Sequence, residues 1–434
     1  MTHLRTRLSI CVLAAALIFT PFTEPQQARA DGAPSPSPAS SPVANPASTP
    51  RFPGIDDELD RILAQQVVAA PELDGSAITT TPVKLNSTAA KVVVSTCPKN
   101  AKFCVEAVPD DNSVVAASGG WPSTCSANQY QTTKGWLAVT RKAACDHEKN
   151  TLRVYDVETK KQVGTATFHM GLTAEALAGG AGWTMTGYLA MWAYTGEGRP
   201  QMVTARVSPS PTGASGGVTG WNAISTNDVW QGSAWISAPT MKSKQVVKGV
   251  GGAWAITASN PKWANTATWV LPRFKSRCDR YYATPGCVIP QMPGVATFSK
   301  ATAPQYAKHV TGALKSGLPG KFGSSSYLTR LTDKTLIRRN RSKACPSSLT
   351  RPKGYSCDEY PFASTKQGAY TASAPKARSQ PWCQMKDPER TGRKGWSRCF
   401  IKATDNSVGG GYLSGFYRLE RMLAGDKFQV GFIA

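Results

Sequence analysis

The cysteines restrict what this chain can fold into more than any other feature of its sequence. Beyond residue 30 there are ten of them, four before residue 150 and six after residue 277, with none between. Because each group is even, each can close its own disulfides within a separate folded region. Spacing alone does not fix the connectivity, but sequence neighbours suggest the pairs Cys97–Cys104, Cys125–Cys145, Cys278–Cys287, Cys345–Cys357 and Cys383–Cys399.

The first 30 residues have the pattern of a signal peptide. Arg5 and Arg7 precede an apolar run from Leu8 to Phe19, and a small-x-small pattern ends at Ala30. The run is too short for a membrane anchor, which needs about 20 apolar residues. We therefore expect cleavage and a secreted, extracellular protein without a membrane span. Disulfides suit that oxidising compartment, whereas zinc is disfavoured because no Cys-x-x-Cys pair occurs.

The positive charge is concentrated in the C-terminal part of the chain. Residues 272–434 contain 28 Lys and Arg against 9 Asp and Glu, which gives +19 of the +23 carried by the whole chain. A basic surface attracts polyanions, because Lys and Arg that neutralise phosphates release condensed counterions. The alternative is a basic surface that serves solubility or adhesion to an acidic cell envelope.

The remaining composition divides the chain into further segments. Residues 31–52 are rich in Pro, Ser and Ala and predict a disordered spacer. Residues 53–82 hold a short amphipathic helix, expected at 55–69, and a linker. Residues 83–271 show short β-branched and aromatic runs divided by Gly, Ser, Asn and Pro, which predict a β-rich domain of unknown role.

We expect the β-rich domain to be an antiparallel β-sandwich. The stretch LRVYDVETKKQVGTATF predicts a hairpin that turns at Glu158, Thr159 and Lys160. A carbohydrate-binding face is an alternative use of its tryptophans, although aromatic residues that alternate with polar ones more often pack a sheet. The tryptophans concerned are Trp183, Trp192, Trp221, Trp230, Trp235 and Trp254.

Residues 272–434 predict a mixed α+β domain. A helix is expected over 304–316, opened by Pro304. Near the C-terminus, YLSGFYRLERMLA predicts a helix that Gly425 stops, and KFQVGFI predicts a final strand. The fold class expected is therefore multidomain, with an N-terminal all-β sandwich-like domain followed by a C-terminal α+β domain.

The stretch CDEYPFAS places two carboxylates side by side in a region short of acids. Asp358 and Glu359 repel each other, which raises at least one pKa unless a positive group compensates. In a phosphate-binding region that group could be Mg²⁺ or Mn²⁺, which prefer oxygen ligands. Neighbours on a strand face opposite ways, so one acid would bind the metal while the other orients water or an arginine. The alternative is a surface acid pair beside Lys and Arg.

This stretch, preceded by GYS, resembles the hallmark of the NucA/NucB family of secreted bacterial deoxyribonucleases, in the Cys-rich form of actinomycetes. YAKHV upstream, LTRLTD with RRNR, and TDNSVGGGYLSGFYR match in the same order, so the resemblance covers about residues 273–434. It implies a nuclease domain with divalent metal-dependent endonucleolytic cleavage of DNA.

The resemblance also implies roles for single residues. Asp358 is central, Glu359 stands beside it, and the later motif contributes Asp405 as support and Asn406 as a residue that could hold a metal-bound water or a phosphate oxygen. His309 corresponds to the family's histidine and would suit a general base, although a lone histidine on an apolar helix is more often structural. Asp358 and Glu359 are thus the expected metal-site residues.

The loop after the two acids departs from the pattern of the family. Gln367 stands where relatives often have Glu, and a neutral amide cannot take up a proton or balance a metal charge. This copy could therefore be attenuated, unless the residue only supports its loop.

The densest basic cluster has phosphate contact as its simplest role, and an exposed solvated loop as the alternative. It comprises Arg338, Arg339, Arg341 and Lys343.

The sequence thus predicts a secreted, sequence-nonspecific, metal-dependent endonuclease that acts on DNA. The alternatives are a catalytically attenuated DNA or polyanion binder, and a glycan or cell-envelope binding module.

Overall fold

The computed structural model describes residues 83–84, 91–94, 97–109, 135–220, 223–224, 229–271, 274–372 and 376–433. The expected signal peptide, spacer and helix at residues 55–69 lie outside these ranges. None of the described helices has both the length and the apolar composition needed to cross a membrane.

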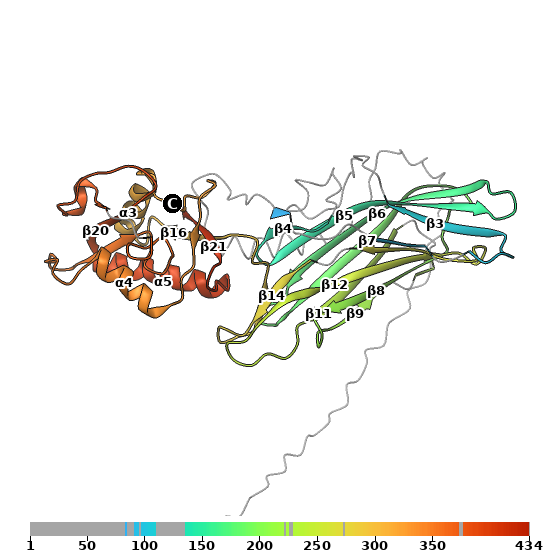
Figure 1. Cartoon of the computed structure of the whole chain (residues 1–434), viewed down its shortest axis with the longest axis horizontal. Coiled ribbons are helices and arrows are strands. Elements are labelled where there is room, and N and C mark those ends of the chain that lie inside the picture. The colour runs from blue at the N-terminus through green and yellow to red at the C-terminus, as the bar shows by residue number, and fades with distance from the viewer. Residues whose placement is uncertain are drawn as a thin grey trace, which may run out of the picture. The chain divides into compact units, whose positions relative to one another are not determined.

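The N-terminal part of the described chain consists of two sheets (Figure 1). The first contains β1 (Val83–Lys84), β3 (Phe103–Pro109), β4 (Leu137–Thr140), β5 (Ala143–Asp156), β6 (Gln162–Ala176), β7 (Gly182–Gly196), β9 (Ser215–Thr219) and β11 (Val229–Ser237). The second contains β2 (Lys91–Val94), β8 (Met202–Ser210), β10 (Ala223–Ile224), β12 (Val246–Ser259), β13 (Ala267–Leu271), β14 (Ser276–Asp279) and β15 (Gly286–Val288).

The predicted hairpin is the central pair of the first sheet. β5 and β6 pair antiparallel over their length, and Lys160 in the turn adopts a φ of +58°. The turn is closed by Asp156, whose Oδ1 accepts a 2.8 Å hydrogen bond from the backbone nitrogen of Thr159. The β-rich character and the position of this turn are confirmed.

One hydrophobic core joins the two sheets. Phe168 of β6 contacts Trp269 of β13, and Trp183 of β7 contacts Phe274, with 5.5 and 4.9 Å between ring centroids. Trp183 and Trp254 are fully buried there, so they cannot belong to a glycan-binding face. Trp235 is exposed, and the side chains of Trp192, Trp221 and Trp230 lie outside the described ones.

A second core belongs to the C-terminal part of the chain. Its strands form one sheet in the order β16 (Gly294–Ser299), β21 (Lys427–Ile433), β17 (Leu328–Thr329), and another in the order β18 (Tyr355–Tyr360), β20 (Trp396–Lys402), β19 (Ala377–Arg378). Its helices are α3 (Pro304–Lys315), α4 (Lys334–Ala344), α5 (Ala403–Leu419) and the short 3-10 helix η1 (Pro381–Cys383). Helix α3 and strand β21 lie where the sequence predicted them.

The first hydrophobic core extends past the domain boundary expected at residues 271–272. β14 pairs with β12 of the second sheet, and Phe274, Ile289 and Met292 belong to the N-terminal core. The C-terminal core begins with Ala296. The change from tryptophan-rich strands to a basic run therefore does not mark the end of the first core, and the division into domains stays a prediction.

Helix α5 begins earlier and ends earlier than predicted. It runs from Ala403, through three consecutive glycines, to Leu419. Glycine lowers helix propensity by about 1 kcal/mol relative to alanine, which is why the sequence favoured a later start. A Cβ atom on Gly409 would collide with the ring of Tyr306 on α3, so this glycine permits the close approach of α5 to α3.

Four of the five suggested disulfides are present: Cys97–Cys104, Cys278–Cys287, Cys345–Cys357 and Cys383–Cys399. The fifth pair stays a prediction, because Cys125 lies outside the described residues.

A buried ion cluster connects the two cores, whose residues belong to one compact unit. Asp426, just before β21, accepts 2.8 Å hydrogen bonds from both Arg141 and Arg277. Arg421 donates a 2.6 Å hydrogen bond to Asp279 of β14. Burial lowers the pKa of Arg141, and the charge of Asp426 opposes that effect. Glu420 and Asp279 lie 3.8 Å from Arg141 and Arg277, so each of these arginines faces a second carboxylate besides Asp426.

Candidate functional site

Strand β18 positions the two adjacent acids on opposite faces of its sheet. It pairs antiparallel with β20, so Asp358 lies beside Cys399 and Glu359 beside Arg398. Side chains alternate along a strand, and paired residues of neighbouring strands share a face. Asp358 therefore faces the C-terminal core, and Glu359 faces the side of the sheet that α4 covers.

His309 holds the Asp358 carboxylate from helix α3. Its Nδ1 lies 2.6 Å from Oδ2 of Asp358, and its Nε2 lies 2.9 Å from Oγ of Ser397. With Asp358 ionised, Nδ1–H donates to the carboxylate and Nε2 accepts from the serine hydroxyl. His309 is fully buried, and both of its nitrogens are occupied. The histidine therefore holds the Asp358 carboxylate in one orientation.

Sequence reasoning missed Ser397. Ser397 stands two residues before Cys399, so the alternation along the strand places both side chains on the same face. This pattern predicts that Ser397 is buried, but it does not predict which residue its hydroxyl contacts. The series of contacts from Ser397 through His309 to Asp358 has the same residue types as a Ser-His-Asp hydrolase triad. Ser397 is only 1% exposed, however, and its hydroxyl is engaged by the histidine.

Helix α5 brings Asp405 and Asn406 to the same face of β18 as Asp358. Asn406 donates from Nδ2 to Oγ of Ser356 at 2.9 Å and to the carbonyl oxygen of Cys357 at 3.3 Å. A carbonyl only accepts, so the amide nitrogen must face it and the amide oxygen is turned away. No hydrogen bond to that oxygen is found among the described residues, so it is available to a ligand.

Asp405 has a structural partner. Its Oδ2 accepts a 2.8 Å hydrogen bond from the backbone nitrogen of Gln305 in the first turn of α3. Helix α3 has no side-chain cap of its own, and its first backbone donors need acceptors. Asp405 therefore caps the helix that carries His309.

Glu359 is a partly buried acid beside a basic helix. Burial and, to a smaller extent, the charge of Asp358 raise the pKa of its carboxyl to about 8, against the opposing effects of Arg341 and the backbone nitrogen of Ala363. The side chain also lies against the Cys345–Cys357 disulfide, with 3.9 Å between Oε2 and Sγ of Cys345. A cation placed beside Glu359 would favour its charged form.

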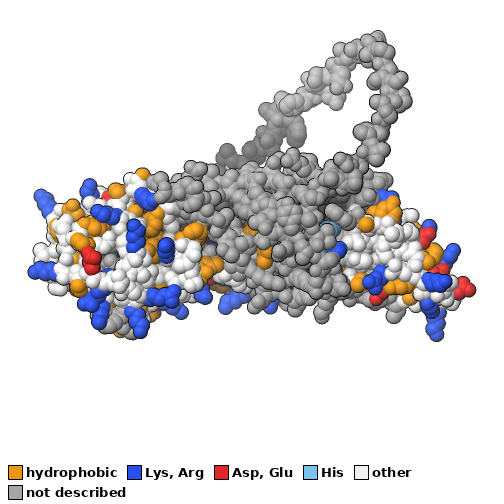
Figure 2. Space-filling model, turned by 90° about the horizontal axis from the view of Figure 1, so that it is seen from above, with side chains coloured by type: hydrophobic (Ala, Val, Ile, Leu, Met, Phe, Trp, Pro, Cys, Tyr) orange, Lys and Arg blue, Asp and Glu red, His pale blue; other side chains and the backbone are white. Residues whose placement is uncertain are grey.

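The basic cluster lies on helix α4, not on a loop. Asp333 caps the helix by accepting hydrogen bonds from the backbone nitrogens of Thr335 and Leu336. The four side chains at 338, 339, 341 and 343 are exposed. Arg339 also donates to the Tyr370 hydroxyl at 3.1 Å, and Lys343 lies 5.5 Å from the ring centre of Trp396. The C-terminal part shows many more Lys and Arg than Asp and Glu side chains on the described surface (Figure 2).

The loop that follows the acids is fixed from two sides. Buried Asn340 of α4 donates to the carbonyl oxygen of Ala363 at 2.7 Å and accepts from the backbone nitrogen of Tyr370 at 2.9 Å. Gln367 accepts from the backbone nitrogen of Thr329 at 2.9 Å and donates to the Thr329 hydroxyl at 3.3 Å. Both ends of the Gln367 amide are thus occupied by β17, which fits a loop-supporting residue.

Asp358, Glu359 and Asn406 supply oxygen donors of the kind that hard cations prefer. Among the described residues no cluster of three or more His, Cys, Asp or Glu side chains suits a metal ion. Mg²⁺ is commonly held by one or two carboxylates, with waters and substrate phosphates completing its shell. Asp358 and Asn406 lie on one side of β18, while Glu359 lies on the other.

Comparison with known families agrees with the motif. Residues 323–431 match the model of the family described as deoxyribonuclease NucA/NucB. The matched stretch includes α4, β18 and α5, whereas α3 with His309 and the β-rich residues lie outside it. No curated protein matches the chain significantly. The predicted resemblance is confirmed over this stretch, and the C-terminal region of the chain is similar to the NucA/NucB deoxyribonucleases.

Proposed function

We propose that the C-terminal region hydrolyses phosphodiester bonds of DNA as a metal-dependent endonuclease without sequence preference. The observation that carries the proposal is the Asp358 carboxylate, held at 2.6 Å by His309 on the side of β18 where helix α5 places Asn406. This carboxylate lies within the stretch that matches the deoxyribonuclease family.

Asp358 and Asn406 would hold the divalent cation, Mg²⁺ or Mn²⁺. When bound, such a cation lowers the pKa of a water and balances the charge that develops on the scissile phosphate. His309 keeps one oxygen of Asp358 fixed, and Asp405 keeps α3 in place through its hydrogen bond to Gln305. His309 thus acts as a positioning residue, because its buried ring cannot reach a substrate.

Glu359 and the basic helix act from the other face of β18. Arg338, Arg339, Arg341 and Lys343 are exposed and would contact backbone phosphates, which position a duplex without reading its sequence. Arg341 favours the charged form of Glu359. We propose that the carboxylate of Glu359 adds negative charge to the catalytic region but does not bind the same cation as Asp358.

We propose export as the setting for this activity. Four disulfides close within the described residues, and disulfides persist in oxidising compartments. The N-terminal signal pattern agrees with that setting. The β-rich region has no proposed role in cleavage.

A plasmid-nicking assay on the purified mature protein tests the function. We expect nicking with Mg²⁺ or Mn²⁺ and none with EDTA. Asp358→Asn should reduce the rate by about 100-fold or more, because the carboxylate charge is lost while the side-chain volume stays nearly constant. Thermal unfolding of the variant provides the folding control.

Three outcomes would count against the proposal. DNA binding without nicking would favour an attenuated polyanion binder, and binding to glycans alone would favour a cell-envelope module. Full activity in a folded Asp358→Asn variant would refute the site.

A further inference from the structure

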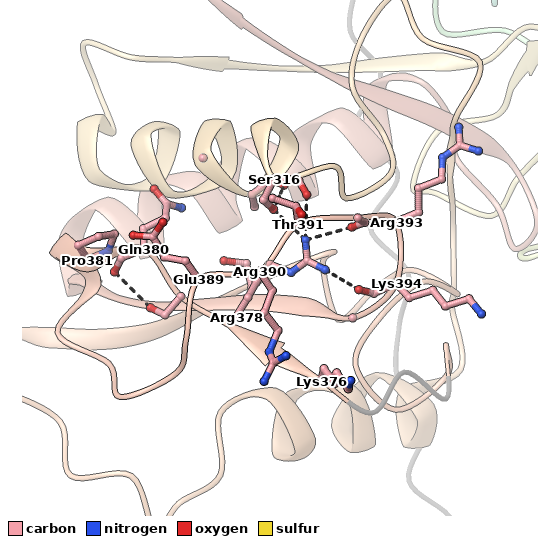
Figure 3. Close-up of a pocket in the computed structure, with 16 residues that line it drawn as sticks. Ser316, Lys376, Arg378, Gln380, Pro381, Glu389, Arg390, Thr391, Arg393 and Lys394 are labelled. Carbon is pink, nitrogen blue, oxygen red and sulfur yellow. Dashed lines mark hydrogen bonds between the residues drawn. The ribbon is translucent and has the colours of Figure 1, made fainter.

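A large basic pocket lies on the Asp358 face of the β18–β20–β19 sheet, apart from helix α4. It has a volume of about 950 Å³ and lies between the C-terminal end of α3, strand β19 and the loop at residues 389–395 (Figure 3). Five of its lining residues are cationic and one is acidic: Lys376, Arg378, Arg390, Arg393, Lys394 and Glu389.

Arg378 is the buried centre of this pocket. It is 3% exposed and donates to the carbonyl oxygens of Ser316, Gly392 and Lys394 (Figure 3). No ion pair to Arg378 is found in the described part of the chain, and its buried Nε has no hydrogen-bond acceptor there. Burial lowers the pKa of this guanidinium, and the charge of Arg390 lowers it further. The carbonyl oxygens accept hydrogen bonds from the guanidinium of Arg378, but they do not neutralise its positive charge.

The other cations lie at the mouth of the pocket. Arg390, Arg393, Lys394 and Lys376 are exposed, and Figure 3 shows Arg393 and Lys394 extending away from the Arg378 guanidinium. No aromatic side chain is among the lining residues. Base recognition on single strands depends on aromatic stacking, whereas phosphate recognition needs only charge and donors. The pocket therefore suits the phosphates of a nucleic acid and not its bases.

The pocket floor is connected to the proposed catalytic acid. Ser397 lines the pocket, and its Oγ lies 2.9 Å from Nε2 of His309, whose Nδ1 lies 2.6 Å from Asp358. Ser397 and Asp358 share a face of the sheet, whereas Trp396 and Arg398 of β20 face α4. The pocket thus lies nearer to the Asp358 face than the cations of α4 do.

We propose that this pocket binds the phosphodiester backbone of DNA beside the scissile bond, as a second phosphate site in addition to α4. The proposal rests on the proposed nuclease function for its choice of polyanion. Arg378 supplies a fixed central charge, and the three cations of the 389–395 loop supply exposed contacts. Recognition through charge alone leaves cleavage independent of sequence.

The test replaces three exposed cationic side chains and keeps Arg378 with its hydrogen bonds to the carbonyl oxygens. The pocket variant is Arg390→Gln with Arg393→Gln and Lys394→Gln. A control variant that removes the same charge elsewhere combines Lys321→Gln, Lys366→Gln and Lys427→Gln, all exposed and outside both basic surfaces. Binding of a fluorescein-labelled 30-base-pair duplex is measured by anisotropy in EDTA at several NaCl concentrations.

We expect the pocket variant to flatten the slope of log affinity against log salt by about 2 to 3 units, because each lost phosphate contact removes about 0.9 unit. The control variant should change the slope by less than about 1 unit. Equal slopes for the two variants would overturn the proposal. So would displacement of the duplex by a 5′-phosphorylated dinucleotide but not by its dephosphorylated form, since the pocket would then select terminal phosphates.

The binding assay separates this inference from the proposed function, because EDTA removes cleavage from the measurement. A wild-type protein that binds through the pocket but never nicks plasmid would refute the nuclease and leave the phosphate site standing. A protein that nicks plasmid, with a pocket variant that matches the control, would refute the phosphate site alone.

Discussion

The partly buried carboxyl of Glu359 predicts that removing its charge stabilises the protein at high pH. Its pKa in the folded chain is raised from 4.5 to about 8, chiefly by burial. A raised carboxyl pKa means that the folded state holds a proton that the unfolded state has released. The free energy of unfolding should therefore fall as pH rises from about 4.5 to about 8, and become constant above that range.

The size of the effect follows from the pKa difference. Each unit is worth about 1.4 kcal/mol, which sets an upper bound of about 5 kcal/mol. The carboxylate retains part of its hydration because it is only partly buried, so we expect about 2 to 4 kcal/mol. Glu359→Gln should raise the free energy of unfolding by this amount at pH 8 and change it little at pH 5.

Urea unfolding of wild type and Glu359→Gln at pH 5 and pH 8, in EDTA, measures both values. Glu389→Gln serves as a matched control, because Glu389 is exposed and its substitution should change stability by less than about 0.5 kcal/mol. An equal effect of Glu359→Gln at the two pH values, or a loss of stability at pH 8, would refute the reasoning. The same variant should cleave more slowly, as expected where an acid that lowers stability serves function.

Three further predictions concern other parts of the molecule. Changing Arg338, Arg339 and Arg341 together to Ala should flatten the salt dependence of DNA affinity by about 2 to 3 units; an unchanged slope in the anisotropy assay would make the exposed face of α4 a solvated surface only. Gln367→Glu should leave the nicking rate within about twofold, because the amide supports the loop through Thr329, and a large gain in rate would instead show attenuation. Asp426→Asn should lower the free energy of unfolding by about 3 to 5 kcal/mol, since two buried arginines lose the carboxylate closest to them; a loss below about 1 kcal/mol by chemical denaturation would contradict that account.

The sequence by itself determined the features that depend on near neighbours. The turn at Glu158 to Lys160, helix α3 and strand β21 follow from local patterns of apolar, glycine and proline residues. The four observed disulfides join cysteines that are 7 to 16 positions apart, where closing a short loop is easiest. Alternation along a strand likewise predicts that the adjacent acids Asp358 and Glu359 face opposite ways.

Only the tertiary structure decided which distant residues meet. His309 contacts Asp358 49 positions away and Ser397 88 positions away, because α3 packs on the β18–β20 pair. Nothing in the local pattern around Ser397 distinguishes it from other serines of the chain. The motif also placed Asp405 near the chemistry, whereas the structure uses Asp405 to cap α3.

Tertiary packing also decided where the first core ends and where helix α5 begins. β14 and β15 lie in the basic part of the sequence but pair within the N-terminal sheets, and α5 continues through its glycines, of which Gly409 permits the close approach of α3. Local propensities differ by about 1 kcal/mol per residue, whereas burying a large apolar side chain is worth about 1.5 to 3 kcal/mol. Packing between distant segments therefore overrides the local pattern, and a single sequence does not state which segments will pack.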